Sequence, residues 1–277
     1  MPTFGGDTAE SYYDEGVTAS MKGDLETAVA QFQKAIRMDH TMASAYHQLG
    51  KCYQRMGNSQ RAVELLREVV TKRPTLIAAR IDYGLALAGA GRGEDARKQF
   101  LQVLALKPGD PKAQLGLAQA YFSEGDWVAA MNEAQAAIAN GPANFSVQYL
   151  FGRSAKLAGQ LQQAETALRK ADSLLEKSLT VDPEKIETHY LRGEVHFVLE
   201  NYPAALEHYN GAIQRAKPGR AYSAYGENFT LADALAKKGL CLQRIGQHAK
   251  AREVADQILA IDPTHKLGRM LKDSKDQ

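Results

Sequence analysis

The feature that most constrains this sequence is a small residue that recurs at a fixed interval. Its members form one column: Gly16, Gly50, Gly84, Ala118, Gly152, Gly193 and Gly239. The first five are 34 residues apart, and the last two steps are 41 and 46 residues. A second column, of alanines, lengthens at the same two places: Ala28, Ala62, Ala96, Ala130, Ala164, Ala205 and Ala251. Two columns in phase over most of a chain indicate one structural unit repeated seven times.

The pattern within one unit is clearest in residues 43–76. One helix face is formed by residues at i, i+3, i+4 and i+7, namely Tyr46, Leu49, Gly50 and Tyr53. Gly57 then suits a left-handed position at the end of this helix. A second apolar face follows, through Ala62, Leu65, Leu66 and Val69. Pro74 disfavours helix in the residue before it, so the unit is predicted to be helix–turn–helix.

The glycines of the small column carry a cost that needs an explanation. Glycine inside a helix is about 1 kcal/mol less favourable than alanine, and six of the seven members are glycine. We expect the compensating gain to be a close approach of the two helix backbones, with the small column opposite the alanine column.

The 34-residue helix pair and the set Tyr46, Leu49, Gly50, Tyr53, Ala62, Leu66 and Pro74 resemble the tetratricopeptide repeat. The resemblance covers residues 9 to about 265. It implies an all-α fold: a right-handed superhelical solenoid of seven helix–turn–helix repeats with a C-terminal capping helix. It further implies a scaffold or adaptor that binds protein segments and is not an enzyme.

The two long steps locate departures from the repeat. The repeats are expected at 9–42, 43–76, 77–110, 111–144, 145–185, 186–219 and 232–265. The fifth repeat is predicted to have a second helix about two turns longer than the others. Residues 220–231 are predicted to be an inserted loop, which could be a lid, an interface or a passive linker. Residues 1–8 are predicted to be an N-terminal extension and 266–277 a capping segment.

Composition and charge argue against several classes of protein. The net charge of +2 gives no strong field for nucleic acid or an anionic membrane. The longest uncharged run, residues 134–152, contains a Gly-Pro break and is not expected to span a membrane. The N-terminus lacks the basic and apolar regions of a signal peptide, so a cytoplasmic location is expected. Cys52 and Cys241 lie too far apart in the array for a disulfide and are expected to be buried free thiols.

No pattern in the sequence predicts catalysis, a metal site or a cofactor. Zinc-binding His-Glu-x-x-His, phosphate-loop and nucleophile-elbow motifs are absent from the sequence. His189 and His196 lie seven residues apart on one predicted helix face, but at positions that face the core in the other repeats. We therefore expect no catalytic residue and no metal or cofactor ligand.

The predicted binding site is another face of each first helix. If the small column is position 8, positions 2, 5, 9 and 12 share that face, and in the tetratricopeptide family it lines a concave groove for peptides or helices. The groove residues so implied, with one neighbour, are Tyr13, Val17, His47, Lys51, Gln54, Arg55, Leu85, Lys112, Leu115, Gln119, Phe122, Tyr149, Arg153, Lys156, Tyr190, Glu194 and Phe197. They are basic and apolar in repeats 2 to 5 and acidic and aromatic in repeat 6. The expected partner is a protein segment with apolar and acidic residues. The alternative is that the aromatics pack on neighbouring helices and the charges are a solvated face.

Two other functions remain open. The aromatic residues of the insertion, Tyr222, Tyr225 and Phe229, could occupy the groove of a second copy and form a homo-oligomer, or cover the chain's own groove. Single-stranded RNA is a less favoured ligand, because helical repeats that bind it usually have a 35-residue period and a more basic groove. The Lys and Asn arrangement by which some tetratricopeptide domains clasp chaperone C-termini is missing from every run of three repeats.

Overall fold

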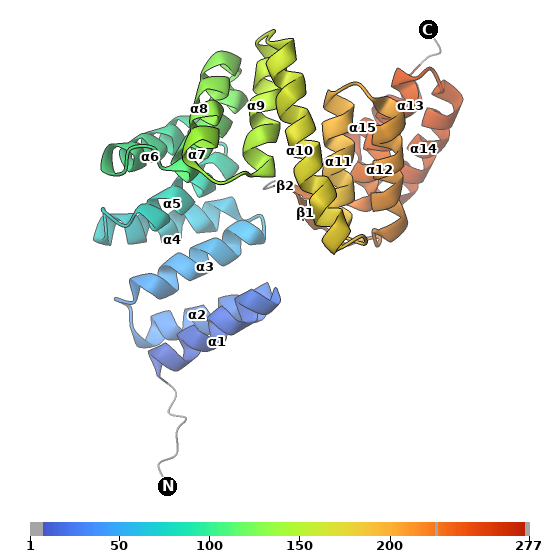
Figure 1. The fold of residues 1–277 in the computed structure, drawn as a ribbon. Coiled ribbons are helices and arrows are strands. Elements are labelled where there is room, and N and C mark those ends of the chain that lie inside the picture. The colour runs from blue at the N-terminus through green and yellow to red at the C-terminus, as the bar shows by residue number, and fades with distance from the viewer. Residues whose placement is uncertain (1–7, 225–226, 275–277) are drawn as a thin grey trace. The chain divides into compact units, whose positions relative to one another are not determined.

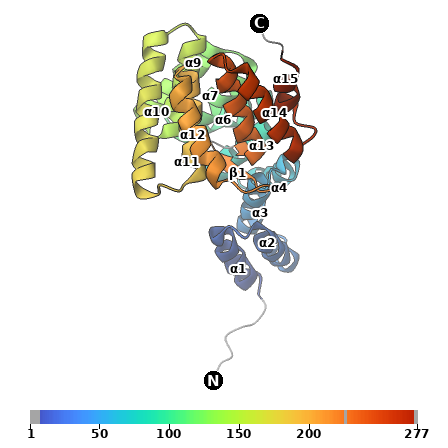
Figure 2. The ribbon, with the colours of Figure 1, turned by 90° about the vertical axis from the view of Figure 1, so that its right-hand side faces the viewer.

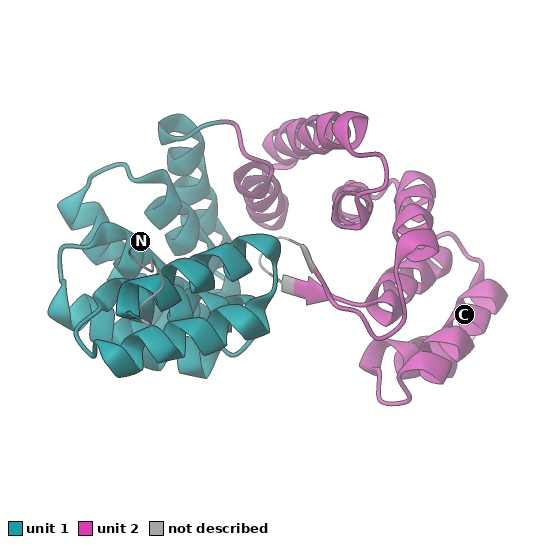
Figure 3. Ribbon diagram, turned by 90° about the horizontal axis from the view of Figure 1, so that it is seen from below, with its two compact units in different colours: residues 1–142 teal, residues 143–277 magenta. Residues whose placement is uncertain are grey.

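The computed structural model describes residues 8–224 and 227–274, which form two compact units divided after Pro142 (Figure 3). Each unit is built of antiparallel helix pairs (Figure 1). In unit 1 the helices are α1 (Ala9–Lys22), α2 (Leu25–Met38), α3 (Ala43–Arg55), α4 (Ser59–Lys72), α5 (Ile77–Gly89), α6 (Gly93–Leu106), α7 (Pro111–Glu124) and α8 (Trp127–Asn140). In unit 2 they are α9 (Phe145–Leu157), α10 (Leu161–Val181), α11 (Ile186–Val198), α12 (Tyr202–Arg215), α13 (Leu231–Arg244), α14 (His248–Ile261) and α15 (Lys266–Asp273).

The helix ends follow from short polar side chains and glycines. Asp24, Asn58 and Asp126 accept a hydrogen bond from the backbone N–H three residues on and so cap second helices. The glycine predicted to follow the first helix has a positive φ in six repeats: Gly23, Gly57, Gly91, Gly125, Gly159 and Gly246. In the pair formed by α11 and α12, Glu200 takes this left-handed position instead, with φ 61°.

The glycines of the small column make room for a large side chain of the second helix. The prediction that they mainly allow the two helix backbones to approach each other is wrong. A β-carbon on Gly50 would lie 2.8 Å from Leu66 Cγ, and one on Gly84 would lie 2.7 Å from a Phe100 ring carbon. Gly16, Gly152 and Gly193 have the same relation to Phe32, Leu168 and Tyr209 respectively. In each pair a large, fully buried side chain of the second helix fills the space above a glycine. A backbone atom comes close as well at Gly152, where Ala164 O would be 3.2 Å away.

The two remaining repeats show that the sizes compensate. In five repeats the large side chain lies sixteen residues after the glycine. Sixteen residues after Ala118 the chain has Ala134, and sixteen residues after Gly239 it has Ala255. The space over Gly239 is filled instead by Leu271 of α15, whose Cδ1 would lie 2.5 Å from an added β-carbon. The alanine column is buried throughout, at no more than 3% exposure.

Helix α10 is the lengthened second helix, at 21 residues against 14 for the other second helices. It packs on α9 and α11 (Figure 2). The apolar face continues into the extension, because Leu175 is buried there.

The insertion differs from the predicted loop. Strands β1 (Tyr222–Ala224) and β2 (Glu227–Phe229) form an antiparallel hairpin in which Tyr222 is paired with Phe229. The hairpin packs against α11 and α13. In the described residues, this two-stranded sheet is the only one.

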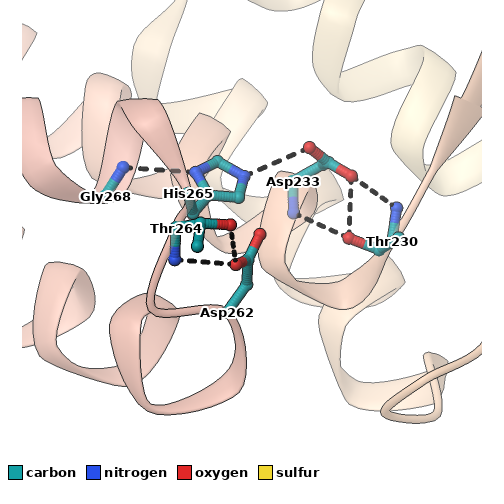
Figure 4. Close-up of polar contacts among 6 residues, drawn as sticks. All are labelled: Thr230, Asp233, Asp262, Thr264, His265 and Gly268. Atoms are coloured by element: carbon teal, nitrogen blue, oxygen red, sulfur yellow. Dashed lines mark hydrogen bonds and ion pairs between the residues drawn. The ribbon is translucent and has the colours of Figure 1, made fainter.

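The C-terminal capping helix predicted from the sequence is α15, and a polar junction fixes its start (Figure 4). His265 Nδ1 accepts a hydrogen bond from Gly268 N (3.2 Å), while His265 Nε2 lies 3.2 Å from Asp233 Oδ1. Asp233 also accepts from Thr230 in the capping box that begins α13. The junction therefore ties the start of α15 to the start of α13. No described helix is both long and apolar enough to cross a membrane.

We predict that Gly84→Ala destabilises the chain although alanine favours helix. The added β-carbon overlaps the Phe100 ring, which is fully buried and also lies against Gly116. Overpacking of this kind costs about 1–3 kcal/mol, against a helix gain of about 1 kcal/mol. Urea unfolding should show a net loss. Gly93→Ala is the matched control, because a β-carbon there meets only Glu124 Oε1 at 3.8 Å. Equal stability of the two variants would contradict the packing role of the small column.

We predict that Glu200→Gly raises the unfolding temperature of the chain by a few degrees. A left-handed backbone costs a non-glycine residue about 1 kcal/mol, and the exposed ion pair that Glu200 makes with Lys156 is worth little. Gly159→Ala is the reverse control, since Gly159 has φ 78° and open space around its Cα. Calorimetry should show a higher unfolding temperature for Glu200→Gly and a lower one for Gly159→Ala. A lower unfolding temperature for Glu200→Gly would show that the left-handed backbone at Glu200 is not strained.

Candidate protein-binding face

The first helices of unit 1 lie next to one another, because α1 contacts α3, α3 contacts α5 and α5 contacts α7. We call the side of these four helices that carries positions 2, 5, 9 and 12 the first-helix face. The sequence predictions that fall on it are Tyr13, Val17, His47, Lys51, Gln54, Arg55, Leu85, Lys112, Leu115, Gln119 and Phe122.

Three of these residues tie neighbouring helices together. His47 Nε2 lies 2.7 Å from Asp82 Oδ2, and Gln54 Nε2 donates to the Asp82 carbonyl (3.0 Å), so both join α3 to α5. Arg55 Nη1 donates to the carbonyl and hydroxyl oxygens of Ser20, at 3.0 and 3.1 Å, and joins α3 to α1. These polar side chains have a structural role that the sequence did not predict.

Other predicted residues of this face are partly in the core. Tyr13 and Val17 pack against the buried cluster of α1 to α3, and the Tyr13 ring centroid lies 5.7 Å from that of Phe32. Phe122 packs edge-on against Trp127, with ring centroids 5.0 Å apart. Leu115 and Gln119 are half-buried. Tyr13 and Phe122 therefore have a packing role, which was the alternative explanation for the aromatic residues of the predicted groove.

The side chains left available on this face are basic and apolar. Within the described residues, the Lys51 and Lys112 ammonium groups have no hydrogen bond or ion pair. Lys112 is exposed, Lys51 is half-buried and Leu85 is 38% exposed. Exposed Glu10 and Asp14 give the α1 end of the face the opposite charge. The centre of the face can thus pair with carboxylates and cover apolar side chains.

In unit 2 several predicted residues are already occupied. Tyr149 is 3% exposed and stacks on Phe145, so in this structure it is a core residue and offers almost no surface for a ligand. The Arg153 guanidinium lies over the Tyr149 ring, 5.4 Å from its centroid. Lys156 Nζ donates to the Val198 carbonyl (2.6 Å) at the end of α11. The Lys156 bond joins α9 to α11, whereas the two ring contacts lie within α9.

The acidic part of the predicted groove forms an internal network. Glu194 accepts a hydrogen bond from the Tyr209 hydroxyl (2.6 Å) and lies 2.8 Å from Lys237 Nζ of α13. Burial and the nearby Glu194 carboxylate raise the pKa of Tyr209 far above its usual range. The Lys237 ammonium also lies 5.9 Å from the Phe197 ring centroid. The charge of Glu194 is therefore satisfied within unit 2.

Two aromatic residues of the insertion, Tyr222 and Phe229, are buried in unit 2. Tyr222 and Phe229 are 5% and 3% exposed, and the Phe229 ring stacks on Tyr190 with centroids 3.9 Å apart. Tyr225 lies outside the described residues. Thus Tyr190, predicted to be a groove residue, is covered by the hairpin.

The sequence did not predict a half-buried polar cluster between α10, α11 and α12. Asp172 accepts from Arg192 at 2.8 and 3.1 Å and lies 3.4 Å from His196 Nε2. The His208 ring stacks on His196, with centroids 5.2 Å apart. Asp172 occupies the position at which the other six second helices carry an apolar residue, such as Val70 and Leu104, and this exception was a sequence signal of an added contact. No group of three or more His, Cys, Asp or Glu side chains in the described ranges could hold a metal ion.

Both cysteines are free and buried, as the sequence predicted. Burial raises the pKa of Cys241 to about 12 and that of Cys52 above its usual value. Neither thiol is therefore activated as a nucleophile.

Family profiles described as tetratricopeptide repeat match residues 81–145, 149–221, 44–75 and 232–265, and a TPR repeat profile matches 21–57. The chain belongs to the tetratricopeptide repeat superfamily. A TPR repeat-containing protein of Pseudomonas aeruginosa is 38% identical over 82 residues, 30% of this chain and 34% of the relative. Tetratricopeptide repeat protein 36 of Danio rerio is 31% identical over 96 residues, 33% of this chain and 51% of the relative. The chain thus spans about half or less of these two relatives.

Solved structures share the fold. A tetratricopeptide repeat protein from Parabacteroides merdae has a TM-score of 0.65 at 13% identity, with 96% of this chain and 98% of that chain covered. PilW, a type IV pilus biogenesis factor, has a TM-score of 0.56 at 17% identity, with 96% and 99% covered. MamA has a TM-score of 0.53 at 24% identity, with 64% and 97% covered. At these identities the likeness establishes the fold alone.

We predict that His208 makes the chain less stable as the pH falls from 6.5 to 4. Burial, and then the positive charge of Arg192 and of protonated His196, lower the pKa of His208 to about 4, against the opposing effect of Asp172. In the unfolded chain His208 takes up its proton near pH 6.5. The contribution of neutral, folded His208 to the free energy of unfolding is therefore fully present above that pH and is lost as the pH falls below it. The difference between the pKa values of His208 in the unfolded and folded chain corresponds to roughly 3 kcal/mol of unfolding free energy.

Urea unfolding at several pH values measures this dependence. His208→Gln should flatten the decline between pH 6.5 and 4, whereas His40→Gln, on the exposed surface, should leave it unchanged. An unaltered slope in His208→Gln would show that other groups cause the acid sensitivity.

Proposed function

We propose that this chain is a non-enzymatic scaffold that binds an extended, acidic and apolar segment of a partner protein on the first-helix face of unit 1. The observation that carries the proposal is the set of side chains left available there, namely Lys51, Lys112 and exposed Leu85. Membership of the tetratricopeptide repeat superfamily supports a scaffold role in protein–protein interaction.

The polar residues of this face differ in whether they bond to neighbouring helices, and this difference supports the site. Arg55, His47 and Gln54 are held by hydrogen bonds to neighbouring helices, so a ligand would have to break those bonds to use them. Lys51 and Lys112 make no such bonds among the described residues. Pairing them with carboxylates breaks no internal contact, and a partly buried ion pair is screened by salt less than an exposed one.

The spacing of the helices suggests the pattern of the ligand. Packed helices lie about 8–10 Å apart, and an extended chain advances about 3.3 Å per residue. Lys51 of α3 and Leu85 of α5 occupy the same position in successive repeats. A segment crossing the helices would therefore present an acidic residue to Lys51 and an apolar residue to Leu85 about three positions away.

We predict that Lys51→Glu with Lys112→Glu weakens binding of such a segment by tenfold or more. Peptides selected from a random phage-displayed library on the wild-type chain should be enriched in acidic residues spaced from apolar ones. Their affinities for the wild-type and variant chains can be measured by fluorescence polarisation. The charge reversal should weaken binding because it replaces two attractions by two repulsions.

The matched control is Arg37→Glu with Arg67→Glu, which makes the same change of net charge on exposed positions of second helices. It should alter affinity less than twofold. If the selected peptides bind the Lys51 and Lys112 variant as tightly as the wild type, the proposed face is not the binding site.

A further inference from the structure

The connection between α12 and α13 is longer than the stacking of those helices requires. The connections that follow α2, α4, α6, α8, α10 and α14 each contain four residues, whereas residues 216–230 make this one fifteen residues long. Helices α12 and α13 pack directly on each other through Leu206 and Ile213 of α12 and Leu235 of α13. The hairpin is therefore an addition to the repeat stack.

The hairpin depends on the surface beneath it. Each strand has three residues, and an isolated two-stranded hairpin is at best marginally stable in water. Yet Tyr222 and Phe229 are almost fully buried, in a cluster that includes Ile186, Tyr190 and Ala234. Most of what stabilises the hairpin must come from this contact.

The contact between the hairpin and α11 resembles the way aromatic side chains of a ligand bind to a protein surface. Phe229 lies parallel to Tyr190, with an interplanar angle of 11°, and Tyr190 is also packed edge-on against Tyr209 in the core. The ring centroids of Tyr222 and Phe229 lie 5.5 Å apart, so two aromatic rings from facing strands are presented together. Aromatic anchors in a desolvated pocket carry much of the affinity of protein interfaces.

Among the described residues, two polar contacts of the hairpin reach its own stem. The Tyr222 hydroxyl accepts from Lys217 N (2.9 Å), and the Arg220 guanidinium lies 5.3 Å from the Tyr222 ring centroid. At the other end, Thr230 forms the N-cap of α13. The contacts with α11 described above are ring stacking and apolar packing, which a different segment with aromatic side chains could supply.

We propose that the surface formed by Ile186, Tyr190 and Ala234 on α11 and α13 is a second peptide-binding site, which the hairpin fills as a built-in ligand. A partner segment that presents two aromatic side chains from facing strands, as a β-hairpin does, exchanges with it. This site is separate from the first-helix face of unit 1, so it does not depend on the function proposed above.

The test uses the hairpin sequence itself as the probe. A synthetic peptide of residues 220–230 is titrated against the full chain and against a variant in which a four-residue Gly-Ser linker replaces residues 221–229. The variant should bind the peptide at least tenfold more tightly than the wild type, because its site is vacant. Phe229→Ser in the peptide, or Tyr190→Ala in the variant, should reduce that binding tenfold or more.

Two comparisons make the result decisive. The full-length double variant Tyr222→Ser with Phe229→Ser vacates the site without shortening the chain, and it should bind the wild-type peptide as well. Lys51→Glu with Lys112→Glu should leave peptide binding unchanged, which separates this site from that of unit 1. If circular dichroism shows both vacated variants folded and neither binds the peptide, the hairpin is only a structural part of unit 2. If both unfold, the same conclusion follows.

Discussion

The structure depends on the contact between a glycine of each first helix and a large side chain of the second helix. Phe32, Leu66, Phe100, Leu168 and Tyr209 each fill the space that a missing β-carbon leaves. Burying such a side chain is worth about 1.5–3 kcal/mol, which exceeds the helix penalty of about 1 kcal/mol for glycine. The two exceptions follow the same rule, since Ala118 is accompanied by Ala134, and Gly239 receives Leu271 from α15.

This packing turns one side of each first helix inward and fixes what its other residues can do. In unit 1, side chains at the edges of the inward side reach the next first helix, as His47 reaches Asp82 and Arg55 reaches Ser20. The remaining positions face solvent, and there the chain carries lysines and an exposed leucine. The proposed binding face thus consists of the positions that are not used for packing between neighbouring first helices.

Unit 2 uses equivalent positions differently. Glu194 is satisfied by Tyr209 and Lys237, Lys156 closes the end of α11, and Tyr190 is covered by the hairpin. Asp172 of α10 brings Arg192 and His196 into a half-buried cluster with His208, and the extension of α10 adds Glu176, 3.8 Å from Arg192. The two departures from the 34-residue spacing therefore both add contacts to the same helix, α11.

The sequence by itself determined the repeats, the helix pairs, the left-handed turns, the longer α10 and the capping helix, because each depends on local spacing or on a residue's backbone preference. The tertiary structure decided which polar residues are free. No spacing rule shows that His47 would bond to Asp82, since that contact crosses from one repeat to the next, or that Tyr149 would be buried. Strand pairing in the insertion was also decided by packing, because three-residue strands form only where Tyr222 and Phe229 find the Tyr190 surface.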